Sequence, residues 1–214
     1  MDEKKKMIRT SEITKNSYCF FSCNFNNSSL DIKPIISIGL CDAYGRTFYA
    51  EISDNNKNDL STDLIQYIDN LELNDGYFDN TTDHYKIKGT YESVSKLLNQ
   101  WLNNNYISKG IKIQFVNDFN PVEFVLLIKL LSNQEILQNV CSTCIQLNHD
   151  MALFINMVES DDIVMDYPDE IAFKINRNDF TDKIEAFNIS GNERNSLYKA
   201  LQIRAIHQFL YNLV

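Results

Sequence analysis

Hydrophobic and polar residues alternate in the first quarter of the chain with the two-residue period of β-strands. Residues 18–25 read YCFFSCNF, in which one apolar residue separates the polar Ser22 and Asn24. Residues 35–42 (IISIGLCD) are almost continuously apolar, and residues 46–52 (RTFYAEI) alternate again. Gly45 lies in the short turn between these two runs, which indicates a β-hairpin. The pattern predicts three strands that form an antiparallel meander.

Helical spacing replaces this alternation in the middle of the chain. Thr90 is a candidate N-cap, and apolar residues follow it at intervals of three and four. These residues are Val94, Leu97, Leu98, Trp101 and Leu102. Residues 111–116 (IKIQFV) predict a further strand, and Pro121 suits the first turn of a helix over residues 122–131.

The later part of the chain predicts two more helices, at about residues 147–157 and 195–213. The order of elements predicts the α/β class, with a mixed sheet in which an antiparallel three-strand meander leads into parallel strands flanked by helices. We expect a flexible N-terminal arm at residues 1–16 and a single domain at residues 17–214. Within that domain, residues 54–88 form a polar excursion with one weakly amphipathic stretch, LIQYIDNLEL.

Composition narrows the class of protein. Hydrophobic residues make up 44% of the chain and aromatic residues 12%, which is typical of a soluble globular protein. The chain lacks an apolar run of the roughly 18 residues that a membrane-spanning helix needs, so we expect no membrane association. The charged N-terminal residues lack the apolar core of a signal peptide, and we therefore expect a cytoplasmic or otherwise intracellular protein.

The formal net charge of −9 bears on the partners of the protein. Proteins that coat phosphate backbones are usually basic, so the acidity counts against a broad nucleic-acid surface while leaving a local site open. It also suits a subunit bound to a protein partner. Candidate contact regions are the N-terminal arm and the excursion, whose aromatic residues are Tyr67, Tyr77, Phe78 and Tyr85.

Five cysteines do not indicate a disulfide framework in an intracellular setting. Cys19 and Cys23 share one strand face and are predicted to lie in the core. Cys141 and Cys144 form a C-x-x-C pair, which would need two further ligands to bind zinc, and His149 is the one nearby candidate. Two half-buried thiols are the favoured interpretation, with a zinc site as the alternative.

Three stretches in the same order carry a resemblance to a known family. Residues 191–210 (GNERNSLYKALQIRAIHQFL) follow the frame H-N-A-L-Y-D-A with an apolar helix behind it. This frame resembles the last motif of the ribonuclease H-like 3′–5′ exonucleases with a four-carboxylate-plus-histidine site, in their bacterial and phage branch. Arg194 stands at the position of the histidine and Lys199 at that of the aspartate. Asn195, Leu197, Tyr198 and Ala200 keep the frame.

The other two motifs of that family match residues 21–25 (FSCNF) and 116–127 (VNDFNPVEFVLL). Ser22 and Asn24 take the positions of the first aspartate and glutamate. Residues 35–40 (IISIGL) are similar to the family's L-I-S-I-G-L. In the second motif Glu123 stands at the catalytic aspartate and Asp118 is retained. The resemblance implies a ribonuclease H-like exonuclease fold over nearly the whole chain.

The family chemistry requires carboxylates, because two divalent ions about 3.5–4 Å apart clamp the phosphodiester and a histidine acts as general base toward water. The family pattern supplies four negative charges. Here Glu123 supplies one, while Arg194 and Lys199 are cationic and Ser22 and Asn24 are neutral. At about 4 Å and an effective dielectric constant of about 20, a unit charge and a divalent ion interact by roughly 8 kcal/mol, so a lysine opposes metal binding. We expect no catalytic residues, metal or other cofactor.

The resulting hypothesis is a catalytically inactive, exonuclease-like protein that binds or scaffolds. Arg194 and Lys199, with Asp118 beside them, would engage a nucleic-acid end or another anion without metal. A second interpretation is an ion pair of Glu123 with Lys199 or Arg194 that fills the former metal space. The alternative function is an active 3′–5′ exonuclease, dependent on Mg²⁺ or Mn²⁺, whose rebuilt site uses Asp118 and Glu123. The three histidines, His84, His149 and His207, are predicted to be surface or packing residues.

Overall fold

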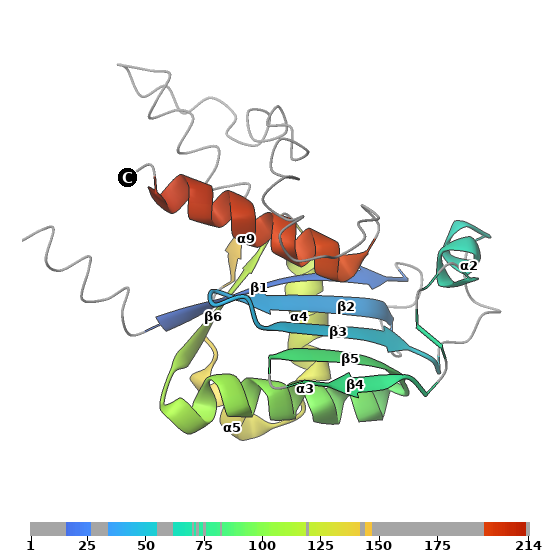
Figure 1. The fold of residues 1–214 in the computed structure, drawn as a ribbon, viewed down its shortest axis with the longest axis horizontal. Helices are drawn as coiled ribbons and strands as arrows, with labels where there is room; N and C mark the ends of the chain where they lie inside the picture. The colour runs from blue at the N-terminus through green and yellow to red at the C-terminus, as the bar shows by residue number, and fades with distance from the viewer. Residues whose placement is uncertain are drawn as a thin grey trace, which may run out of the picture.

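A single seven-stranded sheet organises the computed structural model of the chain (Figure 1). The structure describes residues 16–26, 34–54, 62–69, 71, 73–74, 76–81, 83–118, 120–141, 144–146 and 195–212. Its strands are β1 (Asn16–Phe25), β2 (Ile35–Asp42), β3 (Thr47–Ile52), β4 (Phe78–Asn80), β5 (His84–Gly89), β6 (Lys112–Asn117) and β7 (Ile145–Gln146). Its helices are α2 (Thr62–Asp69), α3 (Tyr91–Asn105), the 3₁₀ helix η2 (Ile107–Lys109), α4 (Pro121–Leu130), α5 (Gln134–Asn139) and α9 (Ser196–Asn212).

The sheet is mixed, and its strands lie in the order β4-β5-β3-β2-β1-β6-β7. β1, β2 and β3 pair antiparallel, as the sequence predicts, and the turn between the last two places Gly45 at φ 92°. β1 pairs parallel with β6, β6 with β7, and β3 with β5. The α/β class and the meander that leads into parallel strands are thus confirmed.

Strand alternation divides the core into two layers, because successive side chains point to opposite faces of a sheet. In Figure 1, α9 covers one face and α3 lies against the other. Buried residues on the face of α3, α4 and α5 include Cys19, Phe21, Cys23, Leu98, Trp101 and Leu127. Those on the face of α9 include Phe20, Cys41, Tyr49, Leu197 and Leu201. The predicted core positions of Cys19 and Cys23 are confirmed.

The polar segment at residues 54–88 contributes more regular structure than its composition suggests. Besides α2, which lies in the amphipathic stretch, it supplies β4 and β5 to the sheet. Tyr85 and Ile87 are buried on β5 while His84 and Lys86 are exposed, which is the alternation of a half-buried strand. Tyr85 stacks on Phe48 with ring centroids 6.3 Å apart, so its expected role in partner contact is corrected to one in the core.

Local signals fix the starts of the main helices. The Thr90 hydroxyl accepts the Ser93 N–H and caps α3, and Asn120 caps α4, whose first turn contains Pro121. α9 begins one residue after its predicted start. The predicted helix at residues 147–157, His149, the N-terminal arm up to residue 15 and Arg194 lie outside the described residues.

Gly39 sets how closely α9 approaches the sheet. A Cβ atom at this position would lie 2.3 Å from the backbone of Leu197, a distance that packed atoms do not tolerate. Glycine therefore lets the first turn of α9 rest directly on β2. This contact between the backbones of α9 and β2 sets where the first turn of α9, which carries Lys199, lies over the sheet.

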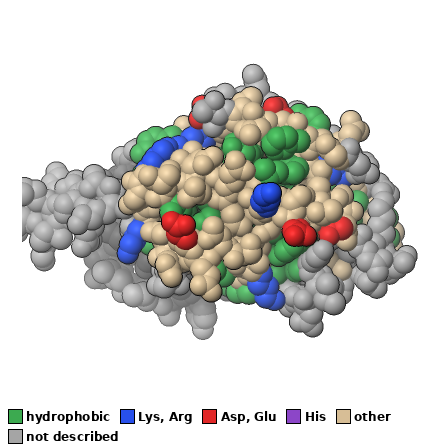
Figure 2. Space-filling view, turned by 90° about the horizontal axis from the view of Figure 1, so that it is seen from below, with side chains coloured by type: hydrophobic (Ala, Val, Ile, Leu, Met, Phe, Trp, Pro, Cys, Tyr) green, Lys and Arg blue, Asp and Glu red, His purple; other side chains and the backbone are tan. Residues whose placement is uncertain are grey.

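On the face drawn in Figure 2, the lysine and arginine side chains of the described residues form no broad basic patch. Figure 2 views the molecule from below, toward the side where α3 and α5 lie, and its coloured lysine and arginine side chains stand apart from one another. This dispersion agrees with the net charge of −9. Among the described helices, each is too short or too polar to cross a membrane.

Candidate functional site: a crevice at the carboxyl ends of β1 and β6

The candidate site lies where two parallel strands separate. β1 pairs with β6 from Asn16 opposite Lys112 to Phe20 opposite Val116, and beyond Phe20 it pairs only with β2. Ligands in open α/β sheets bind outside the carboxyl ends of the strands, and we call the place where β1, α4 and α9 meet beyond this separation the crevice. Ser22 and Asn24 lie on the part of β1 beyond the separation.

Glu123 enters this crevice from the first turn of α4. Its Oε2 accepts the Cys23 N–H at 2.9 Å, an amide that pairing with β6 would otherwise occupy. The Ser22 hydroxyl also donates to the carboxylate. Burial raises the pKa of Glu123 to about 7; these two hydrogen bonds and the charge of Lys199 oppose the rise, and Asp118 adds to it. The carboxyl group therefore changes its charge near neutral pH.

Lys199 reaches the same crevice from the first turn of α9. The Asn195 side chain accepts the N–H groups of Leu197 at 2.8 Å and Tyr198 at 3.2 Å, which fixes the start of the helix. One turn further, Lys199 Nζ donates to Asn24 Oδ1 at 3.4 Å. A cation thus lies against a neutral amide at two positions where the resemblance implies carboxylates.

A row of hydroxyl groups extends the site along the sheet. Asn24 Nδ2 donates to Tyr67 Oη at 2.7 Å and to Ser37 Oγ at 3.2 Å. Ser37 Oγ lies 2.9 Å from Tyr67 Oη and 3.1 Å from Ser196 Oγ. Through Tyr67, helix α2 therefore contacts the crevice, although the sequence indicates only an interface role for this tyrosine.

Sequence reasoning missed Ser37, Tyr67 and Ser196. Ser37 faces Asn24 directly in the register of β1 and β2, so an assumed hairpin register would have found it. Ser196 lies within the last motif, at the position of its first alanine, and only that position could have indicated it. Tyr67 is 43 residues from Asn24, and its approach depends on tertiary structure.

The structure brings together four of the five positions of the family site: Ser22, Asn24, Glu123 and Lys199. Asp118 follows β6 and acts on Glu123 through its charge. Within the part of the chain that is described, Lys199 makes its polar contact with Asn24 and not with a carboxylate. Of the two ion pairs that the sequence suggests for Glu123, the one with Lys199 is not formed among the described residues, and the one with Arg194 lies outside them.

These residues do not fit the two divalent ions that the resemblance implies. One Glu123 oxygen already accepts a main-chain N–H, and Lys199 places a positive charge beside Asn24. Among the described residues, the acidic, cysteine and histidine side chains form no group of three arranged to hold a metal ion. We derive no reaction step through a metal here.

Two neighbouring groups have structural roles. Cys144 Sγ donates to Asn117 Oδ1 at 3.5 Å, and burial raises the pKa of this thiol to about 12. Cys141 and Cys144 are both partly buried free thiols, as favoured by the sequence. His207 packs against Tyr18 and Phe20 with ring centroids 4.6 and 5.0 Å apart, and burial lowers its pKa to about 4. His207 is thus the neutral packing residue that the sequence predicts.

Neither a protein-family model nor a curated protein matches the chain. We therefore infer the function from the arrangement of the residues in the crevice.

Proposed function

We propose that the protein is a pseudo-nuclease that binds a nucleic-acid end, or another small anion, in the crevice between β1, α4 and α9. The observation that carries the proposal is the position of Lys199, whose amine is held by the neutral Asn24 beside a carboxyl group that titrates near pH 7. A cation in this place can contact a phosphate oxygen directly, in the position that a metal-dependent nuclease reserves for metal ligands.

Charge explains why the crevice suits a small anion. Lys199 is partly exposed, so its remaining N–H donors are open to a ligand. The net charge of −9 repels a long polyanion at a distance, whereas a single terminal phosphate meets mainly the local field. We expect about one or two phosphate contacts, and hence a shallow dependence of affinity on salt.

Glu123 couples this binding to pH. An anion beside the carboxyl group disfavours the carboxylate, so bound phosphate raises the pKa of Glu123 further above 7. Binding therefore takes up a proton at neutral pH. As the pH falls from 8 to 6, the affinity of the wild type should rise relative to that of Glu123→Gln, because both share the titration of the phosphate itself and the variant lacks that of Glu123.

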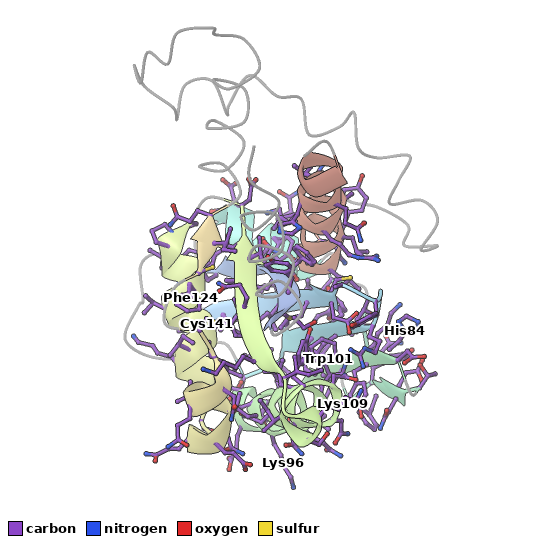
Figure 3. The ribbon with its side chains drawn as sticks, turned by 90° about the vertical axis from the view of Figure 1, so that its left-hand side faces the viewer. His84, Lys96, Trp101, Lys109, Phe124 and Cys141 are labelled. Carbon is purple, nitrogen blue, oxygen red and sulfur yellow. The ribbon has the colours of Figure 1, made fainter. Side chains whose placement is uncertain are left out.

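The test measures fluorescence anisotropy of a short labelled single-stranded RNA or DNA with a 3′-phosphate, in EDTA. We expect binding by the wild type and a loss of about tenfold or more in Lys199→Gln. Lys96→Gln is the control, because Lys96 is an exposed lysine of α3, on the other face of the sheet, and Figure 3 shows its side chain pointing away from that sheet. Binding that Lys199→Gln leaves unchanged would contradict the proposal.

The same oligonucleotides, incubated with Mg²⁺ or Mn²⁺, test the active-enzyme alternative. Shortening from the 3′ end that disappears in Glu123→Gln would mean that Asp118 and Glu123 form a working metal site, and the pseudo-nuclease proposal would be abandoned. If the oligonucleotides bind in EDTA and are not shortened when Mg²⁺ or Mn²⁺ is present, the result supports the pseudo-nuclease proposal.

A scaffolding role for a protein partner has one observation in its favour. β4 is an edge strand of the sheet, and Phe78 on it is 52% exposed beside the 37% exposed Tyr77. Edge strands offer unpaired backbone groups and large apolar side chains to a partner. Phe78→Glu should abolish a complex formed through this edge while leaving oligonucleotide binding intact, whereas Lys199→Gln should have the opposite pattern.

A further inference from the structure

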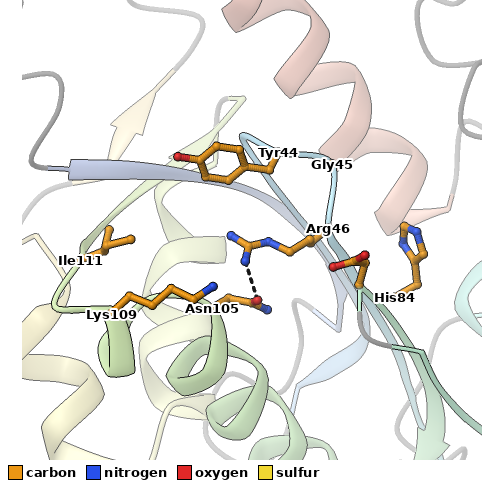
Figure 4. Close-up of a pocket in the computed structure, with 8 residues that line it drawn as sticks. Tyr44, Gly45, Arg46, His84, Asn105, Lys109 and Ile111 are labelled. Carbon is orange, nitrogen blue, oxygen red and sulfur yellow. Dashed lines mark hydrogen bonds between the residues drawn. The ribbon is translucent and has the colours of Figure 1, made fainter.

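A second concave region lies at the opposite end of the central strands, next to the turn between β2 and β3. Its volume is about 480 Å³, and its walls are the turn, the end of α3 and helix η2 (Figure 4). Tyr44, Arg46, Asn105 and Lys109 are among the residues that line it. This volume lies within the range of small-molecule sites, roughly 300–1,000 Å³.

Arg46 is held in this cavity by two fixed contacts. Its Nε donates to the carboxylate of Asp42, which is completely buried, and its Nη1 donates to Asn105 Oδ1 at 2.7 Å. Asp42 Oδ1 in turn accepts the N–H groups of Tyr44 and Arg46, at 2.8 Å each. The guanidinium is thus pre-organised, and among the described residues no acceptor takes its remaining N–H groups.

The other two walls supply an aromatic face and a second cation. Tyr44 is 75% exposed, and the centre of the Arg46 guanidinium lies 5.3 Å from its ring centroid. Lys109 ends η2 and is exposed, and in Figure 4 its amine extends toward Asn105. An exposed aromatic ring stacked on a fixed arginine, with a lysine opposite, matches the chemistry of a phosphate-bearing planar ligand.

We infer that this cavity binds a nucleoside monophosphate. The phosphate accepts hydrogen bonds from the free edge of Arg46 and from Lys109, and the base stacks on the face of the Tyr44 ring that Arg46 leaves exposed. Asp42 and Asp83 together balance the charges of Arg46 and Lys109, so attraction for the phosphate depends on the directed N–H groups of Arg46 and Lys109 and not on a net positive charge. Asp83 also lines the cavity, and its negative charge favours a single phosphate over a di- or triphosphate. The site is separate from the crevice and does not depend on the proposed function.

The Asp42–Arg46 pair also holds the β2–β3 turn, and this role needs neither Tyr44 nor Lys109. The side chains of both are exposed, so Tyr44→Ala and Lys109→Gln should leave folding unchanged. These two substitutions therefore separate ligand binding from stabilisation of the turn. Arg46 variants are unsuitable for this purpose, because they leave a buried carboxylate unpaired.

The experiment titrates the full chain with AMP, adenosine and inorganic phosphate by calorimetry, with circular dichroism as the check on folding. We expect AMP to bind more tightly than either fragment. Tyr44→Ala should weaken AMP and adenosine by about tenfold and spare phosphate, and Lys109→Gln should weaken AMP and phosphate and spare adenosine. Lys96→Gln, at an exposed lysine of α3, should change none of the three.

Two results would overturn the inference. One is the absence of AMP binding up to about 10 mM, since a dissociation constant above that concentration would not indicate a specific site. The other is AMP binding that neither Tyr44→Ala nor Lys109→Gln weakens. Loss of AMP binding in Lys199→Gln alone would place the nucleotide in the crevice instead.

Discussion

A carboxyl group lies at each end of the central strands, Asp42 completely buried and Glu123 partly buried, and the two are stabilised in different ways. At the β2–β3 turn, Asp42 receives two main-chain N–H groups and the charged side chain of Arg46. In the crevice, Glu123 receives the Cys23 N–H and the Ser22 hydroxyl, while Lys199 acts on it without a direct ion pair. A directly paired carboxylate fixes structure, whereas one that lacks a touching cation keeps a proton equilibrium near neutral pH.

The largest expected effect comes from removing the cation at the Asp42 end. Arg46→Met should destabilise the fold by about 3–5 kcal/mol, because it leaves the buried Asp42 carboxylate without a charged partner. Chemical denaturation at pH 8 measures this loss. The double variant Asp42→Asn, Arg46→Met should recover much of it. A single-variant loss below about 1 kcal/mol would mean that Arg46 is not needed to compensate Asp42.

The next effect concerns the proton on Glu123. Because the folded pKa is about 7, raised above the usual 4.5, the folded state holds the proton more tightly than the unfolded state. This contribution is fully present below pH 4.5 and is lost as the pH rises to 7. Glu123→Gln, which resembles the protonated form, should therefore be more stable than the wild type at pH 8, by about 3 kcal/mol at most.

Denaturation of both proteins between pH 4.5 and 8 measures this difference. The wild type should lose stability across that interval more steeply than Glu123→Gln. Parallel curves would show that Glu123 has an ordinary pKa and that the comparison between the two carboxyl groups is wrong.

A substitution at Gly39 tests the packing that positions Lys199. Gly39→Ala places a Cβ atom 2.3 Å from the Leu197 backbone, so α9 must move away from β2. We expect destabilisation of about 1–3 kcal/mol together with weaker anion binding in the crevice. Gly110→Ala serves as the control for a substitution without a steric clash. The space around Gly110 is open, and an alanine there would be strained only by the φ of 67°. AMP binding at the β2–β3 turn should survive Gly39→Ala.

The smallest expected effect is electrostatic. The charge of Lys199 lowers the pKa of Glu123, so Lys199→Met should raise that pKa further above 7 with little change in stability. NMR titration of the Glu123 carboxyl carbon measures the shift. Lys109→Met at the other end should leave the titration unchanged. A fall of the pKa in Lys199→Met would contradict the geometry of the crevice.

Local sequence signals account for much of the fold. The meander, the cap at Thr90 and the proline at the start of α4 follow from alternation, hydrogen bonding and restricted φ. β5 was missed because its alternation spans only six residues and lies in a segment rich in asparagine and aspartate. Such short strands depend on a neighbour, and β5 obtains one by pairing with β3 across the chain.

The candidate site, like the fold, could be predicted from the sequence only in part. The family-like frames identified Ser22, Asn24, Glu123 and Lys199, since each lies at a fixed offset within a strand or a first helical turn. They did not reveal the direction of the Lys199 side chain, which depends on the contact between Gly39 and Leu197. Nor did they indicate Tyr67, which reaches Asn24 from a helix elsewhere in the chain. Distances between elements, unlike offsets within them, are properties of packing.

The main-chain amide of Cys23 gives the protein an intrinsic reporter. Its hydrogen bond to Glu123 ties the amide proton to a group that titrates near neutral pH. In a ¹H–¹⁵N spectrum, the Cys23 resonance should therefore shift with pH around 7, although a strand amide has no titration of its own. Ligands that enter the crevice should move the midpoint of this shift, so that occupancy can be read from one peak without any attached label.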